Sequence, residues 1–108
     1  MATAFQAGAW VDVSQETGTL ILRVCGELDI ASRALIEPAV LAAIPTAYAV
    51  TLDLRDLEFC DSSGLAMFVA AHERAKAEGT VLTVRNLEPP VRRVFELSGV
   101  DQVIDITE

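Results

Sequence analysis

One segment in the middle of the chain constrains the fold more than any other, because it joins a strand pattern directly to a helix pattern. Val50, Leu52 and Leu54 alternate with polar residues, which is typical of a half-buried strand. After a short gap, apolar residues recur at helical spacing from Leu65 until Gly79, a residue type that commonly ends helices. The segment therefore predicts a strand followed by a helix.

The string Asp61-Ser62-Ser63 stands at the start of that predicted helix. Each of these residue types can cap a helix, and capping alone explains most strings of this kind. The same position also favours a phosphate, since the first turn of a helix has unpaired N–H groups and the positive end of the helix dipole. Two interpretations stay open at this point: a plain helix cap, or a functional site at these serines.

The rest of the chain alternates strand and helix patterns around this segment. Alternating residues predict strands over 9–13 and 20–25, joined by a short turn and therefore paired as an antiparallel hairpin. The other expected elements are strands at 50–54, 81–85 and 103–106. Helices are expected from Asp29 or Ser32 to about residue 44, at about 62–78, and from the segment 86–90 to Gly99. We find no internal repeat, and we expect residues 1–108 to form a single domain.

The first helix pattern leaves three points open. Asp29 or Ser32 can cap its start. Pro38 lies inside the pattern, where a proline removes a hydrogen bond, so either the helix kinks there or the part before Glu37 is irregular. Two sets of residues are equally suited to face the core, and they are Leu35, Ala39 and Ala42, or Ile36, Val40 and Ala43.

The order of elements, ββαβαβαβ, predicts an α/β fold with a single layer of about five mixed, mostly parallel strands. Because strand–helix–strand crossovers are right-handed, a sheet that grows in one direction carries all three helices on one face. The apolar strand residues agree with this arrangement: Leu20, Leu22, Val24, Val50, Leu52, Leu54, Leu82 and Val84. The outward face then holds Arg23, Thr51, Asp53, Thr83 and Arg85, with Asp53 expected between the two arginines.

Composition excludes several classes of protein. Of 108 residues, 16 are acidic and 8 are basic, which gives a net charge of −8 and argues against binding nucleic acid through its phosphates. We see no signal peptide, and the most apolar stretch is too short to span a bilayer. Cys25 and Cys60 make no disulfide framework or zinc spacing, so we expect a reduced, cytoplasmic protein without a membrane partner.

The usual catalytic constellations are missing from the sequence. His72 is the only histidine and lies about ten residues along the helix from Ser62, roughly 15 Å away, so it cannot act as its base. We find no phosphate-binding glycine loop and no cluster of metal-ligand residues, and we predict no enzyme activity, cofactor or metal. Cys25 and Cys60 could approach each other as a redox switch, although buried cysteines commonly act as small hydrophobes.

Three motifs together resemble those of STAS domains, specifically the bacterial anti-sigma factor antagonists. The string Leu54-x-x-Leu57-x-Phe59-x-Asp61-Ser62-Ser63-Gly64-Leu65 is similar to the family signature. Gly26-Glu27-Leu28-Asp29 and the segment from Val91 to Gly99 resemble two further motifs of the family. They occur in the family's order and spacing, and they cover the chain from about Ala9 to Ile106.

The resemblance implies the STAS fold and a switch controlled by phosphorylation. The phosphorylated residue would be Ser62, and less favourably Ser63, because the family modifies the serine directly after the aspartate. The kinase would be the anti-sigma factor itself, with a histidine-kinase-like ATPase fold. The unphosphorylated protein would bind it and release a sigma factor for stress response or sporulation, and a phosphoserine phosphatase would restore that form.

The resemblance also implies a partner-binding surface: Glu27, Asp29, Asp61, Ser62, Ser63, Gly64 and Leu65. Gly64 in the first turn costs helix stability, so it either admits a partner's backbone or provides simple flexibility. We expect a monomer or a weak dimer. The alternative function is a STAS scaffold or transporter-associated domain in which Ser62 is never phosphorylated and only caps its helix.

Overall fold

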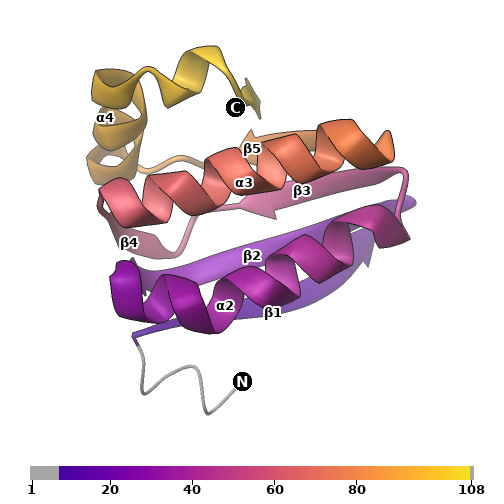
Figure 1. Cartoon of the computed structure of the whole chain (residues 1–108), viewed down its shortest axis with the longest axis horizontal. Coiled ribbons are helices and arrows are strands. Elements are labelled where there is room, and N and C mark those ends of the chain that lie inside the picture. Colours follow the sequence, from indigo (N-terminus) through magenta and orange to yellow (C-terminus); the bar gives the residue numbers. More distant parts are fainter. Residues whose placement is uncertain (1–7, 108) are drawn as a thin grey trace.

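A computed structural model describes residues 8–107 of the chain, which form one sheet covered by helices (Figure 1). Its elements are β1 (Ala9–Glu16), β2 (Thr19–Leu28), α2 (Ile30–Ala43), η1 (Ile44–Thr46), β3 (Ala49–Asp53), β4 (Leu57–Cys60), α3 (Ser62–Glu78), β5 (Val81–Arg85), α4 (Pro89–Ser98), η2 (Val100–Gln102) and β6 (Asp105–Thr107).

The sheet has the strand order β1-β2-β3-β5-β6, and β4 pairs with the far end of β2. The hairpin β1–β2 is antiparallel, and every other pair is parallel. Figure 1 shows α2 and α3 side by side in front of the strands, with α4 near β4 and the start of α3. The predicted one-sided α/β layer is confirmed.

The core lies between the sheet and the helices, and it contains all eight strand residues that the alternation predicted to face inward. Phe68 of α3 and Phe95 of α4 contact each other there, with ring centroids 5.4 Å apart. Of the two possible inward sets on α2, the structure selects the second: Ile36 and Val40 are buried, whereas Leu35 is 49% exposed.

Pro38 does not interrupt α2, which runs without a break from Ile30 to Ala43. The alternative of an irregular segment before Glu37 is therefore wrong. Pro38 lies on the exposed side of the helix. Its ring is accommodated away from the core, and the helix lacks the hydrogen bond that the N–H of residue 38 would donate.

Two strand predictions need correction. The sequence predicted five strands, but β4 is a sixth: Leu57 and Cys60 are buried while Glu58 and Phe59 are exposed, so no alternation marks it. It forms because β2 is longer than predicted and offers Gly26–Leu28 as a pairing edge. The last strand is Asp105–Thr107 rather than 103–106, since a 3-10 turn occupies Val100–Gln102 and Ile104 N–H bonds to Val100.

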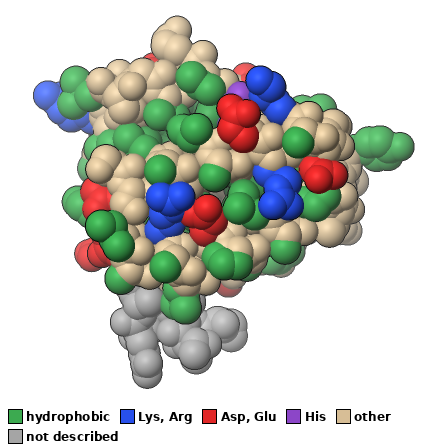
Figure 2. Space-filling view, in the orientation of Figure 1, with side chains coloured by type: hydrophobic (Ala, Val, Ile, Leu, Met, Phe, Trp, Pro, Cys, Tyr) green, Lys and Arg blue, Asp and Glu red, His purple; other side chains and the backbone are tan. Residues whose placement is uncertain are grey.

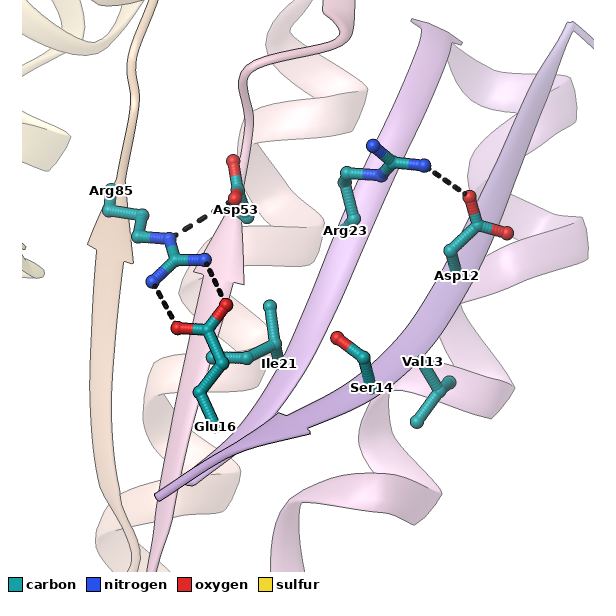
Figure 3. A pocket seen from close by; sticks show the side chains of 8 residues that line it. All are labelled: Asp12, Val13, Ser14, Glu16, Ile21, Arg23, Asp53 and Arg85. Atoms are coloured by element: carbon teal, nitrogen blue, oxygen red, sulfur yellow. Dashed lines mark hydrogen bonds and ion pairs between the residues drawn. The ribbon is translucent and has the colours of Figure 1, made fainter. Parts of the chain in front are cut away.

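Asp53 is the centre of a polar network on the face of the sheet that carries no helices (Figure 3). Its carboxylate accepts hydrogen bonds from Arg85 at 3.1 Å, from the Asn86 amide at 3.1 Å and from the Arg55 N–H at 3.0 Å. Burial alone would raise the pKa of Asp53, but these hydrogen bonds outweigh it and lower that pKa below its usual value. Arg85 also pairs with both carboxylate oxygens of Glu16, at 3.1 and 3.2 Å.

As expected, the strand register places Asp53 between Arg23 and Arg85, and Arg85 is the arginine that pairs with it. Arg23 instead contacts Asp12 at 2.9 Å and Asp56 at 3.2 Å. The antiparallel register of the hairpin explains this, because it places Asp12 directly opposite Arg23. Figure 3 shows Arg23 and Asp12, together with Asp53, Arg85 and Glu16, around an open pocket of about 460 Å³ on this face.

Candidate functional site

The candidate site is the edge of the sheet where β2 and β4 end and where α2 and α3 begin. The two strands are parallel, with Leu28 opposite Cys60, so their carboxyl ends meet at one edge. A hydrogen bond of 3.2 Å from the Asp61 N–H to the Leu28 carbonyl ties the two strand ends together. This arrangement brings Asp29, which caps α2, close to the start of α3 at Ser62. We call the residues Glu27, Asp29, Phe59, Asp61, Ser62 and Ser63 the switch corner.

The residue that caps the N-terminus of α3 is Asp61, not Ser62. The Asp61 carboxylate accepts the Gly64 N–H at 3.0 Å, and the Asp61 carbonyl accepts the Leu65 N–H at 2.9 Å. Ser62 is the first residue of the helix and is exposed, while Ser63 is half-buried. The interpretation of Ser62 as the helix cap is therefore wrong: the cap of the predicted string is its aspartate.

The start of α2 uses both of the residues that the sequence offered as caps. The Asp29 carboxylate accepts the Ser32 N–H at 3.0 Å, and the Ser32 hydroxyl accepts the Asp29 N–H at 2.9 Å. The fully buried Ser32 hydroxyl also donates to the Glu27 carbonyl at 2.7 Å. Hydrogen bonds from the Ser32 N–H and hydroxyl lower the pKa of Asp29, which keeps its charge at the switch corner.

Two of the predicted partner-binding residues lie beneath the surface. Leu65 is 7% exposed and belongs to the core. Gly64 is buried, and a Cβ there would lie 2.8 Å from the Cys60 sulfur and 2.9 Å from the Leu28 carbonyl oxygen. The chain's own strands fill the space at Gly64, so neither a partner's backbone nor simple flexibility explains this glycine.

Exposed apolar side chains border the carboxylates of the switch corner. Phe59 of β4, 48% exposed, lies opposite Glu27 in the strand register. Ile30, the first residue of α2, is 75% exposed. Sequence reasoning missed both residues as surface features, because β4 shows no alternation and Ile30 belongs to neither of the inward sets proposed for the first helix.

Residues 8–107 hold no group of three or more histidine, cysteine or acidic side chains placed to bind a metal ion. No helix among them is both long and apolar enough to cross a bilayer. His72 is half-buried in the middle of α3, as expected for a residue at the core margin.

Cys25 and Cys60 are both free thiols. Cys60 belongs to the core beneath the helices, whereas Cys25 follows the side of β2 that carries Arg23. Burial raises the pKa of Cys25 to about 11 and that of Cys60 to about 12, which makes both poor nucleophiles. The two thiols therefore lie on opposite faces of the sheet, which excludes the redox-switch alternative and leaves both cysteines as small buried residues.

A protein-family model described as "Mlab, STAS domain" matches residues 11–107. The chain belongs to the STAS domain family. The anti-sigma-B factor antagonist of Bacillus subtilis is 28% identical over 97 residues, which cover 90% of this chain and 89% of that protein.

Solved structures of anti-sigma factor antagonists have the same fold. An anti-sigma factor antagonist from Mycobacterium paratuberculosis superposes with a TM-score of 0.82 at 28% identity, covering 91% of this chain and 84% of that one. The Bacillus protein SpoIIAA, at 24% identity, superposes with TM-scores of 0.73 in its unphosphorylated form and 0.67 in its phosphorylated form. Those matches cover 92% of this STAS domain and 89% and 92% of the SpoIIAA chains.

Proposed function

We propose that this STAS domain is an anti-sigma factor antagonist that is switched off by phosphorylation of Ser62. The observation that carries the proposal is made at the start of α3, where Asp61 caps the helix and Ser62 beside it is an exposed residue. The names of its relatives support the proposal, since they are antagonists of anti-sigma factors. The partner is an anti-sigma factor with a histidine-kinase-like ATPase fold, and a phosphoserine phosphatase reverses the modification.

The physics of the switch follows from charge at the switch corner. Phosphorylation adds about −1.5 to −2 charges at neutral pH. The helix N-terminus can hold the phosphate through its free amides, so the fold need not change. The added charge lies near the carboxylates of Glu27, Asp29 and Asp61, on a protein whose net charge is already −8. A partner surface that is complementary to the unmodified switch corner is therefore no longer complementary after phosphorylation, because the corner is bulkier and more negative.

The proposal also sets what the protein does not do. We propose a cytoplasmic binding protein without catalytic activity, in which Ser62 is a substrate of the partner and not a nucleophile. The alternative is a STAS scaffold or transporter-associated domain whose Ser62 is never modified. The exposed hydroxyl favours the switch, because helix capping does not require Ser62.

Phosphorylation is tested by incubating the protein with ATP and each histidine-kinase-like anti-sigma factor of its own genome, followed by intact-mass measurement. We expect the gain of one phosphate in the wild type and in Ser63→Ala, and no gain in Ser62→Ala. Modification of Ser63 would move the site by one residue. No gain with any of these kinases would refute the switch and leave the scaffold function.

Binding is tested with the kinase found in that assay. We expect Ser62→Asp to weaken the complex about tenfold or more, which corresponds to about 1.4 kcal/mol. Ser62→Ala is the matched control, since it removes the hydroxyl without adding charge, and its affinity should stay near that of the wild type. A folded Ser62→Asp variant that binds as tightly as Ser62→Ala would contradict the proposed mechanism.

A further inference from the structure

The solvent side of α2 is apolar along its whole length. Every exposed residue of this helix is hydrophobic, and we call this set the α2 ridge: Ile30, Ala31, Ala34, Leu35, Pro38, Ala39 and Ala42. The only charged residues of the helix, Arg33 and Glu37, are partly buried beside the ridge and pair with each other. Figure 2 looks onto this side of the molecule, where hydrophobic side chains follow the lower helix, α2.

The ridge differs from the other helix surfaces of the protein. A surface helix normally carries polar residues toward solvent. The exposed residues of α3 follow that rule, and they are Ser62, Glu73, Arg74, Lys76, Ala77 and Glu78. The chain has 24 charged residues, so its composition does not explain why the exposed face of α2 carries none. A contiguous exposed apolar surface of this kind commonly marks an interaction site.

The spacing within the ridge fits a helical occupant. Ala31, Leu35, Pro38 and Ala42 follow one another at intervals of four, three and four residues, which aligns them as a seam along the helix. Such seams pack against a second helix, and alanine at two of the four positions allows a close approach.

A second copy of this chain is a poor occupant. The helix is about 21 Å long and about 10 Å wide, so the ridge offers roughly 200 Å². A stable complex needs about 800 Å² from each partner. Two copies would also bring together two net charges of −8. The ridge therefore fits a larger interface with a partner of opposite charge.

The ridge is continuous with the switch corner, because Ile30 directly follows Asp29. We propose that the α2 ridge is the second half of the docking surface for the anti-sigma factor partner. That partner presents an apolar helix to the ridge and a basic patch to the acidic switch corner. The inference rests on the proposed function and adds a surface that phosphorylation does not reach.

Distance separates the two halves of this surface. Ala42 is 12 residues beyond Ile30, about 18 Å along the helix axis. Charges separated by more than about 8–10 Å at physiological salt are largely screened, so a phosphate on Ser62 acts on the corner and barely on the far ridge. The phosphorylated protein therefore keeps the part of its affinity that the ridge supplies.

The test compares Leu35→Glu with Leu97→Glu, measured by calorimetry against the anti-sigma factor that phosphorylates the wild type. Leu97 is a matched control, since it is 76% exposed on α4 and lies outside the proposed surface. We expect Leu35→Glu to weaken binding about tenfold or more and Leu97→Glu to change it less than about twofold. Ala39→Glu, an exposed change to a good helix former, repeats the test should Leu35→Glu fold poorly.

Three results separate this inference from the proposed function. Equal affinities of the Leu35→Glu, Ala39→Glu and Leu97→Glu variants would overturn the ridge and leave the Ser62 switch intact. If no histidine-kinase-like anti-sigma factor binds the wild type, the proposed function itself is refuted. Sedimentation that shows a wild-type dimer, dissolved by Leu35→Glu, would assign the ridge to a second copy instead. With the ridge correct, Ser62→Asp weakens the Ala39→Glu variant by the same factor as the wild type, because residue 39 lies about 13.5 Å beyond Ile30 along the helix and distant effects add.

Discussion

Replacing Gly64 with alanine should destabilise the protein, although alanine is the better helix former. The new Cβ would lie 2.8 Å from the Cys60 sulfur and 2.9 Å from both the Leu28 Cγ and the Leu28 carbonyl oxygen. Carbon contacts are ordinarily about 3.5 Å or longer, so the first turn of α3 would have to move by roughly 0.6 Å. Rotation of the Leu28 side chain cannot relieve this, because its carbonyl belongs to the backbone of β2.

Two opposing contributions decide the size of the effect. Overpacking of this kind costs about 1–3 kcal/mol. Glycine to alanine inside a helix gains at most about 1 kcal/mol, and less in a first turn. The expected net loss in the free energy of unfolding is about 1–2 kcal/mol. In a domain of this size, each kcal/mol lost lowers Tm by roughly 4–8 °C.

Urea unfolding of Gly64→Ala, Cys60→Ala and the double variant measures this loss and its origin. Removing the Cys60 sulfur should recover part of the stability lost in Gly64→Ala, with a coupling energy of about 0.5–1.5 kcal/mol between the two substitutions. The rest of the loss should persist, because the Leu28 carbonyl still contacts the new Cβ. The reasoning would be refuted by a Gly64→Ala variant that is as stable as the wild type with an unchanged slope in urea. Such a result would mean that α3 can shift away from β2 at little cost.

Two further changes test the structure away from the switch corner. Asp53→Asn should lower the free energy of unfolding by about 2–3 kcal/mol at neutral pH, because the Asp53 carboxylate is almost buried and pairs with Arg85. Asp56→Asn is the control: its ion pair with Arg23 is half-exposed, so the loss should be less than about 1 kcal/mol. The pKa of Asp53 is lowered in the folded protein, so its contribution is complete above the unfolded pKa near 4 and disappears as pH falls through the lower folded value. Urea unfolding of the wild type and of Asp53→Asn at several pH values should show their free energies of unfolding converging in acid. A difference that stays constant down to pH 2 would contradict the lowered pKa of Asp53. Pro38→Ala should stabilise the protein by about 1–2 kcal/mol, because α2 is continuous and alanine restores the missing hydrogen bond. This net gain allows for the conformational entropy that the alanine variant regains in its unfolded chain. A lower Tm for Pro38→Ala would refute the continuous helix.

The candidate site was only partly predictable, because its roles are set by contacts between distant segments. The string Asp61-Ser62-Ser63 located the start of a helix correctly, whereas three residues of Gly26-Glu27-Leu28-Asp29 lie inside the neighbouring strand, which extends to Leu28. Which residue of the string caps the helix depended on the backbone path from β4. The burial of Leu65 and the tight space at Gly64 depended on how α3 packs on β2.

By itself, the sequence determined the local elements of this protein and the side of each strand that faces the core. Alternation, helical spacing and capping residues act over a few neighbouring positions, so they can be recognised without knowing the fold. The tertiary structure alone decided that Leu57–Cys60 is a strand, that Arg23 pairs with Asp12, and that the apolar ridge of α2 stays uncovered. Strand register and helix packing join residues far apart in the chain, and no local pattern specifies those partners.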